Sequence, residues 1–288
     1  MGNMDFHLFN FAYVLYTISA ILYLLYAFTK NKILARNAFF LTTSAVIIHL
    51  AVIVLRAYLR HAEYQVTWYA LCTNRFEIIS FFVFAAGAIF LALQILYGMI
   101  YPVVFVMPLL WIILNFSLAY PLLIGSGGNG FWNAVNVSRA ISNPAPAFQS
   151  LWMIFLPPVM VLAFSAFAMA FALGIVYIIR ERNYKYGKPA ELPGDAIDAK
   201  TLDDVIYKLI SFGFMALTLG IVLYSRWSYD ARGRYWVWKA EEIGMFITWI
   251  TYLIYLHARL VMERRGKMSV LTAMVCFGVG VIACICRA

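Results

Sequence analysis

Two histidines lie inside long apolar runs of the sequence and are its best candidates for cofactor or proton chemistry. His49 lies in the middle of the run 38–59, and His257 lies near the end of the run 243–260, in "TYLIYLHARL". Polar side chains cost about 2–3 kcal/mol in hydrocarbon, so their presence there is informative. Imidazoles on two helices can face each other and ligate a haem iron or pass protons. Alternatively, each histidine only hydrogen-bonds a neighbouring helix, or His257 lies at the membrane interface beside Arg259.

A second candidate is the segment "GRYWVWKAEE", residues 233–242, between two apolar runs. An extended backbone would place Trp236 and Trp238 on one face, because strand side chains alternate. Glu242 would complement the positive N-terminus of the helix that follows. Stacking surface next to cations suits a flat dianion such as haem, whereas an aromatic belt at the membrane interface is the alternative. The cations of this region are Arg226, Arg232, Arg234 and Lys239.

Membrane-spanning helices must position these residues. The 288 residues are 64% hydrophobic and 12% charged, which is too apolar for a water-soluble domain of this size. Runs long enough to cross about 30 Å of hydrocarbon recur along the chain. They cover 9–29, 38–59, 77–98, 102–123, 151–179, 205–224, 243–260 and 268–286. We therefore predict an all-α, polytopic transmembrane helical bundle of about eight helices, a single domain over 1–288 with a tryptophan-rich loop at 225–242.

The distribution of basic residues predicts the orientation in the membrane. Lys and Arg are frequent after the first, fifth and seventh runs, which places those loops in the cytoplasm. Both termini and the loop 225–242 are then extracytoplasmic, and the protein lies in a bacterial or archaeal cytoplasmic membrane or its thylakoid equivalent. The net charge of +9 suits contact with anionic membrane lipid. Nucleic acid is not an expected partner, because no basic stretch lies outside the short loops.

Several other polar residues bear on a cofactor site. Glu77 opens the third run, and His61 and His7 lie where an external site could use them, although each suits a solvated loop as well. A haem would be non-covalent, because the sequence contains no CxxCH segment. Cys284 and Cys286 form a pair in the last run that is either redox-active or a pair of small hydrophobic side chains.

Two stretches of the sequence resemble one family. "RGRYWVWKAEEIGMFITWITYLIYLHARL" is similar to the signature WGxYWxWDxxE, followed by ITW and YLHxR, of the CcsA/ResC-type cytochrome c biogenesis proteins. "IIHLAVIVLRAYLRHAEYQVTWYALCTNRFEIISFFVF" is similar to that family's membrane histidine, arginine and Asn-x-[YF]-Glu pattern. The resemblance covers roughly residues 40 to 265, and the chain resembles a divergent member of that family.

The resemblance implies a haem-handling role. In such proteins the tryptophan-rich loop lies outside and presents haem for attachment to apocytochrome c, with histidines as iron ligands. It implies the following sites: Trp236, Trp238 and Glu242 in the haem platform, His257 in a membrane haem site, and His49, Asn74 and Glu77 at family-specific positions.

Departures from the signature concern charge and outer histidines. The first Trp of the signature is Arg232 here and its Asp is Lys239, so both changes add positive charge. An outer histidine expected near "QSLWMIFLPPV" is absent, with Leu156 or Pro157 in its place, and no histidine follows His257. The usual external bis-histidine site therefore cannot be built, and any enzymatic role is at most a share in a cytochrome c haem lyase complex.

Three functions follow from these observations. The leading one is a membrane protein that binds haem b and presents it at the extracytoplasmic face, with a CcsB/ResB-like protein or a c-type cytochrome as partner. The second is an electron-transfer subunit whose haem b, held by His49 and His257, passes electrons between quinol and an external cytochrome. The third is a scaffold of a respiratory complex that binds no haem.

Overall fold

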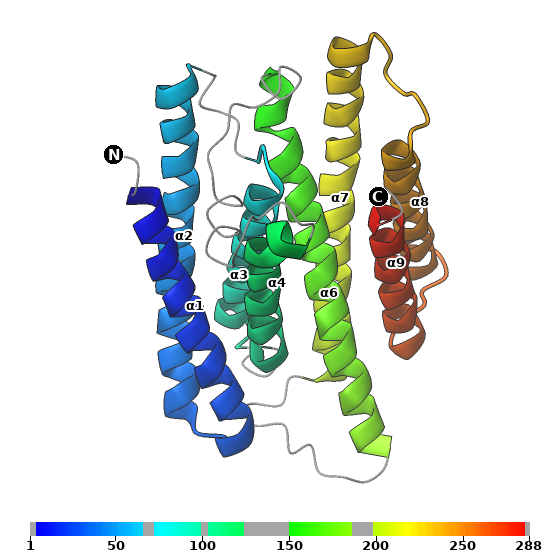
Figure 1. Ribbon diagram of the computed structural model, residues 1–288. Coiled ribbons are helices and arrows are strands. Elements are labelled where there is room, and N and C mark those ends of the chain that lie inside the picture. Colours follow the sequence, from blue (N-terminus) through cyan, green and yellow to red (C-terminus); the bar gives the residue numbers. More distant parts are fainter. Residues whose placement is uncertain (1–3, 66–71, 99–102, 124–149, 186–197, 286–288) are drawn as a thin grey trace. The chain divides into compact units, whose positions relative to one another are not determined.

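The computed structural model describes residues 4–65, 72–98, 103–123, 150–185 and 198–285, which form helices (Figure 1). The first helices are α1 (Met4–Thr29), α2 (Lys32–Tyr64), α3 (Arg75–Tyr97), α4 (Val103–Leu123) and the short 3-10 helix η2 (Leu151–Ile154). They are followed by α6 (Leu156–Lys185), α7 (Ala199–Arg232), α8 (Ala240–Leu260) and α9 (Lys267–Ile285). These described α-helices correspond one for one to the predicted apolar runs. The prediction of an all-α, polytopic helical bundle is confirmed.

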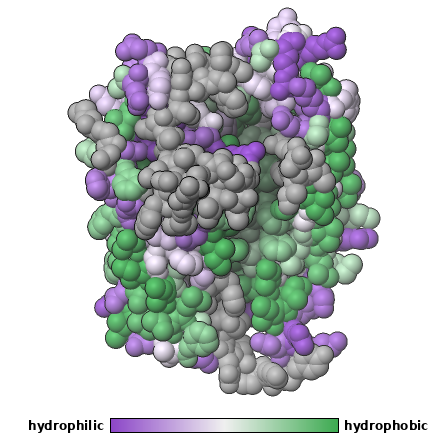
Figure 2. All heavy atoms as spheres, viewed as in Figure 1, coloured by the Kyte–Doolittle hydropathy of each residue, from purple (hydrophilic) through white to green (hydrophobic). Residues whose placement is uncertain are grey.

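Length and hydropathy identify membrane spans among these helices. Six are long and apolar enough to cross a membrane, namely α1, α2, α3, the stretch Leu151–Asn183, α7 and α8. Shorter apolar stretches, Val106–Phe116 and Lys267–Ala283, lie in α4 and α9. Figure 2 shows hydrophobic residues over much of the middle of the face in view, with hydrophilic residues most numerous near its top and bottom. The chain is an integral membrane protein, while the side on which each terminus lies stays a prediction.

The chain divides into two compact units, Met1–Val161 and Leu162–Ala288. The first unit contains α1 to α4, η2 and the beginning of α6, and the second contains the rest of α6 and α7 to α9. His49 and Glu77 belong to the first unit. His257 and the tryptophan-rich segment belong to the second.

Small and hydroxyl-bearing residues bring α1 close to α2 in the first unit. Ala12, Ala38 and Ala45 are almost completely buried, which allows close approach of helix backbones in a membrane protein. The hydroxyl oxygens of Ser19 and Thr42 lie 2.5 Å apart. Side-chain hydrogen bonds also join α1 to α4, because Tyr13 donates to Asn115 at 2.7 Å. These contacts hold α1, α2 and α4 together.

Glycines allow close helix contacts in the second unit. A Cβ atom on Gly244 of α8 would lie 2.8 Å from the carbonyl oxygen of Ala283 in α9, so only glycine fits there. Phe167 of α6 stacks on Tyr252 of α8, with ring centroids 3.8 Å apart. At one end of the unit, Arg259 pairs with Asp203 at 2.6 Å, which ties the end of α8 to the start of α7.

The helical boundaries revise the extent of the predicted loop 225–242. α7 continues to Arg232, and α8 begins at Ala240. Residues 225–232 are helical because the stretch keeps a buried face, including Trp227 and Ser228, and an Arg226–Asp230 ion pair four residues apart on the other. Gly233 ends α7 with φ of 72°, a left-handed conformation that glycine adopts easily. Residues 233–239 alone lie between the two helices, and we call them the tryptophan loop.

Candidate functional site

The tryptophan loop presents aromatic rings that touch one another. The ring centroids of Trp236 and Trp238 are 5.9 Å apart at an interplanar angle of 81°, and both rings contact Phe246 of α8 edge to face. Trp238 is 65% exposed. Its φ of 60° lies in the left-handed region, so the loop is not the regular extended strand expected from the sequence. The two indoles meet edge to face and do not form a flat, parallel plate.

The aromatic surface continues along α8 toward the middle of the helix. Phe246 stacks on Trp249 with centroids 6.5 Å apart, and Trp249 stacks on Phe214 of α7 at 5.6 Å. Trp249 also donates from its indole to the hydroxyl of Thr218 at 3.0 Å. Phe246 was not identified from the sequence, and Trp249 entered there only as part of the ITW motif. Their three-residue spacing, which places both on one helix face below Trp238, is the signal that indicates them.

One polar atom among these rings has no partner. The indole nitrogen of Trp236 is buried and has no hydrogen-bond acceptor among the residues that the structure describes. A buried N–H without an acceptor costs about 1–3 kcal/mol, and such groups in native proteins call for an explanation. An oxygen from a bound molecule would satisfy this donor.

Glu242 is enclosed beneath the loop. Its side chain is fully buried, and Oε2 accepts hydrogen bonds from the backbone N–H groups of Val237 and Trp238 at 2.6 and 2.5 Å. Oε1 lies 3.3 Å from the hydroxyl of Tyr224, which can donate to it. The structure therefore places Glu242 behind the rings and next to the loop backbone.

The cations of the segment differ in exposure. Arg232 lies 3.6 Å from Glu242 Oε1, donates to the Tyr224 hydroxyl at 3.3 Å, and stacks over the ring of Trp227. Arg234 and Lys239 are exposed, and neither takes part in an ion pair among the described residues. The exposed edge of the loop thus combines the ring of Trp238 with two positive charges.

His49 lies in a closed polar position between α1, α2 and α3. Its ring is completely buried, with Nδ1 3.3 Å from the Tyr16 hydroxyl and Nε2 2.6 Å from the Ser80 hydroxyl. The rings of Phe9, Tyr16 and Phe84 contact it edge to face. Both ring nitrogens have hydrogen-bond partners, so ligation of iron by Nε2 would require displacement of Ser80. Ligation by His49 stays a prediction.

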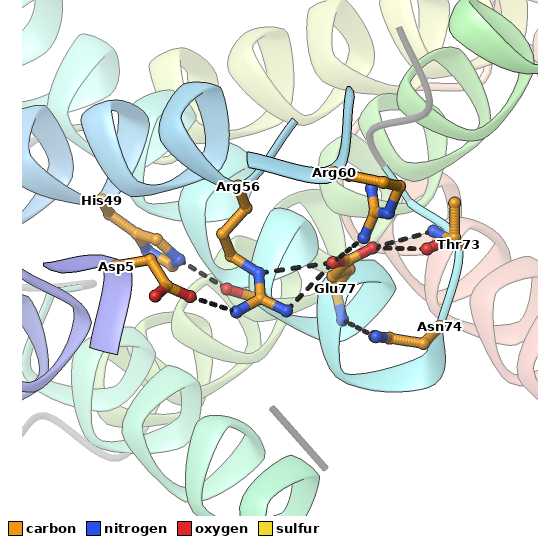
Figure 3. Close-up of polar contacts among 8 residues, drawn as sticks. Asp5, His49, Arg56, Arg60, Thr73, Asn74 and Glu77 are labelled. Atoms are coloured by element: carbon orange, nitrogen blue, oxygen red, sulfur yellow. Dashed lines mark hydrogen bonds and ion pairs between the residues drawn. The ribbon is translucent and has the colours of Figure 1, made fainter. Parts of the chain in front are cut away.

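Glu77 is the centre of a buried charge cluster at one end of the first unit (Figure 3). Arg56 donates to Glu77 Oε1 at 3.1 Å and to Asp5 at 2.8 Å, and Arg60 also donates to Glu77 Oε1. Glu77 Oε2 accepts from the backbone and hydroxyl of Thr73 at 3.0 and 2.9 Å. Two carboxylates and two guanidinium groups neutralise one another there. We call Asp5, Arg56, Arg60 and Glu77 the Glu77 cluster.

Asp5, Arg56 and Arg60 were not among the site residues predicted from the sequence. Arg56 and Arg60 are four residues apart on the face of α2 that carries His49, and this spacing is the available signal. Asn74, expected at a family-specific position, caps α3 by accepting a hydrogen bond from the Glu77 backbone at 2.8 Å. The Glu77 cluster therefore joins α1, α2 and α3, and the Glu77 side chain is buried within it.

The remaining histidines are exposed. His257 lies exposed on α8, as His7 does on α1 and His61 near the end of α2. His257 and His49 belong to different units, so their pairing across one haem stays a prediction. Cys284 and Cys286 lie outside the described side chains. Within the described residues, no group of three or more His, Cys, Asp or Glu side chains could hold a metal ion.

Fold and site together define a polytopic helical membrane protein with an aromatic and cationic loop at the end of two helices. Residues 8–286 match the family described as Cytochrome C assembly protein. Because this match covers almost the whole chain, the chain belongs to that family. The resemblance seen in the sequence is confirmed.

Cytochrome c biogenesis proteins named CcsA match parts of the chain. The cytochrome c biogenesis protein CcsA of Mesostigma viride is 30% identical over 156 residues, which cover 46% of this chain and 50% of that protein. CcsA of Synechococcus elongatus is 42% identical over 81 residues, or 28% of this chain and 25% of that protein. The matches therefore span half or less of these relatives.

A solved structure shares the fold. The cytochrome c haem lyase CcmF superposes with a TM-score of 0.67 at 18% identity, over 96% of this chain and 46% of that one. At this identity the similarity shows the fold alone. It extends through nearly all of the chain, including both compact units.

Proposed function

We propose that this protein handles haem in cytochrome c biogenesis, binding it non-covalently as haem b and presenting it at the extracytoplasmic face. Family membership over residues 8–286 carries this proposal, supported by the names of the CcsA relatives. The family and the names of its CcsA relatives favour this function over the alternative of an electron-transfer or anchoring subunit.

The tryptophan loop suits haem as a ligand. Trp238 offers an exposed aromatic face, and Arg234 and Lys239 offer charges for two propionate groups. The indole N–H of Trp236 has no acceptor among the described residues and is buried, so a propionate oxygen would reach it only if the neighbouring side chains moved. His257 is the best candidate for an axial ligand of a separate haem within the membrane, because it lies at the other end of α8, about 25 Å from the tryptophan loop at 1.5 Å per helical residue. Haem, when bound, supplies the iron and the vinyl groups that react with cytochrome thiols.

The chain's own residues would orient haem and balance its charge. The aromatic rings of the loop fix the plane of the haem, and the cations bind its propionate groups. A CcsB/ResB-like protein or an apocytochrome c with a CxxCH segment is the proposed partner. Any haem lyase activity belongs to the complex with that partner.

The absorption spectrum of the detergent-purified chain tests the proposal. A Soret band and sharp α and β bands after dithionite reduction are expected, with the haem extracted by acid acetone because no CxxCH holds it. The protein without any Soret band would overturn haem handling and favour the scaffold function. Haem staining that survives denaturing electrophoresis would contradict non-covalent binding.

The side of the membrane can be tested at the same loop. Gly233 has the left-handed φ that disfavours other residues, so Arg234→Cys is the better position for a label. An impermeant maleimide is expected to label this cysteine in whole cells, because the loops placed in the cytoplasm carry most of the basic residues. Labelling only after lysis would reverse the proposed topology.

A further inference from the structure

We infer that Glu242 is a positioning residue for the haem platform: its buried carboxylate fixes the backbone of the tryptophan loop and thereby the orientation of Trp238. The inference rests on the proposed function, because it assigns to Glu242 a place behind the ligand surface and not in contact with the ligand. Arg232, which contacts Glu242, helps to hold the loop as well. Arg234 and Lys239 are then the cations that face the ligand.

The carboxylate holds two successive amides of the loop. Oε2 accepts from the N–H groups of Val237 and Trp238, both of which precede α8. A glutamate in the third position of a helix commonly accepts from the N-cap N–H, and Glu242 reaches further back, to the two residues before the N-cap Lys239. Successive amides around one anionic oxygen form a concavity that fixes the backbone there. The loop is held at the two residues that set the direction of the Trp238 side chain.

The other oxygen ties the loop to α7. Oε1 lies 3.3 Å from the Tyr224 hydroxyl and 3.6 Å from Arg232 Nη1, and both residues belong to the last turns of α7. Arg232 is also fixed by its stacking on Trp227 and its hydrogen bond to Tyr224. One carboxylate therefore connects the end of α7, the tryptophan loop and the start of α8. Arg232 occupies this connection although the family signature has a tryptophan in its place.

The backbone of Trp238 requires such support. Its φ of 60° is a conformation that non-glycine residues avoid. The side chain remains 65% exposed and contacts neighbouring rings only edge to face, so aromatic packing alone does not fix it. The hydrogen bond from its own N–H to Glu242 is the closest polar constraint on this residue.

Limited proteolysis tests the support without any ligand. Trypsin cuts after Arg234 and Lys239, and cleavage requires the loop to leave its clamped conformation. In the full-length chain in detergent, Glu242→Ala is expected to raise the cleavage rate at these two sites on the order of tenfold, the effect of losing charge-assisted hydrogen bonds. Glu242→Gln keeps one oxygen for the two amides and loses the attraction to Arg232, so its rate is expected to be intermediate.

Glu241 provides the matched control. It is the adjacent carboxylate, half-buried, and its contact is the Tyr224 hydroxyl at 3.4 Å, not the loop amides. Glu241→Ala is expected to leave the cleavage rate within about twofold of the wild type. Equal rates in Glu242→Ala and the wild type, or equal acceleration by Glu241→Ala, would overturn the inference. Where Glu242→Ala does not accumulate, the comparison of Glu242→Gln with Glu241→Gln decides it.

Haem titration distinguishes positioning from general stabilisation. Haemin added to the haem-free chain is expected to bind on the order of tenfold more weakly to Glu242→Ala, followed by its Soret band. In a Trp238→Ala background, removal of Glu242 is expected to add less than about twofold, because the two residues act through the same ring. Full additivity would overturn the positioning role. A wild-type chain that binds no haemin would overturn the proposed function, while the proteolysis result would still decide whether Glu242 holds the loop.

Discussion

Glu77 and Glu242 occupy the same position in two helices but have different structural roles. Each is the third residue of its helix, α3 or α8, and each accepts a backbone N–H from the segment before that helix. Each also lies within ion-pair distance of arginine from the helix before it. The same local arrangement therefore occurs once in each compact unit.

The two sites differ in what surrounds the carboxylate. The Glu77 cluster is closed, because the side chains of Arg56 and Arg60 are only 8% and 1% exposed and Asp5 supplies the second negative charge. Around Glu242, Arg232 is 26% exposed, and the loop above carries the exposed ring of Trp238. The first arrangement locks three helices together, whereas the second supports a surface that can meet a ligand.

Among substitutions of the two carboxylates, the largest loss of stability is expected at Glu77. Glu77→Ala removes the buried carboxylate that both Arg56 and Arg60 contact, which is expected to cost about 3–5 kcal/mol of stability. Thermal unfolding of the purified chain in detergent measures the loss. Glu242→Ala is the matched variant and is expected to lose less, because Arg232 can turn toward solvent. Equal losses would show that the two carboxylates are structural to the same degree.

The second prediction distinguishes the roles of His257 and His49. His257→Ala is expected to weaken retention of a haem bound within the membrane and to shift its spectrum from low spin toward high spin, because it removes a proposed axial ligand. His49→Ala loses hydrogen bonds to Tyr16 and Ser80 and is expected to lower stability by about 1–3 kcal/mol. Soret absorbance per polypeptide and thermal unfolding of both variants are the measurements. Equal loss of haem in both would support ligation by the pair, and unchanged haem in His257→Ala would remove this ligand.

Much of the fold could be predicted from the sequence because each apolar run is long enough to cross a membrane. The runs 38–59 and 243–260 lie within α2 and α8, and the family was identified from motifs close to them. The end of α7 was not predicted, because its last turns carry charges that suggested a loop. Arg226 and Asp230, four residues apart, indicate helix only when both are considered together.

The interior of the sites could be predicted only in part. Glu242 was identified as a platform residue, but its contact with the loop backbone depends on the left-handed turn at Trp238. The residue types in the loop do not predict this turn. The pairing of Asp5 with Arg56 joins residues 51 positions apart. Such contacts depend on how helices pack, and apolar length and spacing within one helix do not specify them.

A third prediction uses Cys72 as a reporter of the Glu77 cluster. Burial, and then the nearby charge of Glu77, raise the pKa of the Cys72 thiol, so little thiolate forms near neutral pH. In a chain whose other cysteines are serine, maleimide labelling at Cys72 is expected to be slow at pH 7 and to rise at higher pH. Glu77→Ala removes a cause of the raised pKa and opens the segment, so labelling is expected to become several-fold faster. Unchanged labelling would show that the segment around Cys72 does not depend on Glu77.

The smallest effect is expected at Lys239, where stability and binding should change in opposite directions. Lys239 is the N-cap residue of α8 and makes no side-chain capping hydrogen bond. Lys239→Asp restores the residue of the family signature, can cap the helix and suits its positive end, which is expected to stabilise the chain by about 0.5–1 kcal/mol. The same change removes an exposed cation of the ligand surface, so haemin is expected to bind about two- to fivefold more weakly, and less so at high salt.

Arg226→Gln, which changes an exposed cation already paired with Asp230, is the control and is expected to leave the affinity for haemin unchanged. Thermal unfolding and haemin titration at low and high salt measure the two effects. Tighter binding in Lys239→Asp would show that Lys239 does not face the ligand and would leave Arg234 as the remaining cation of that surface.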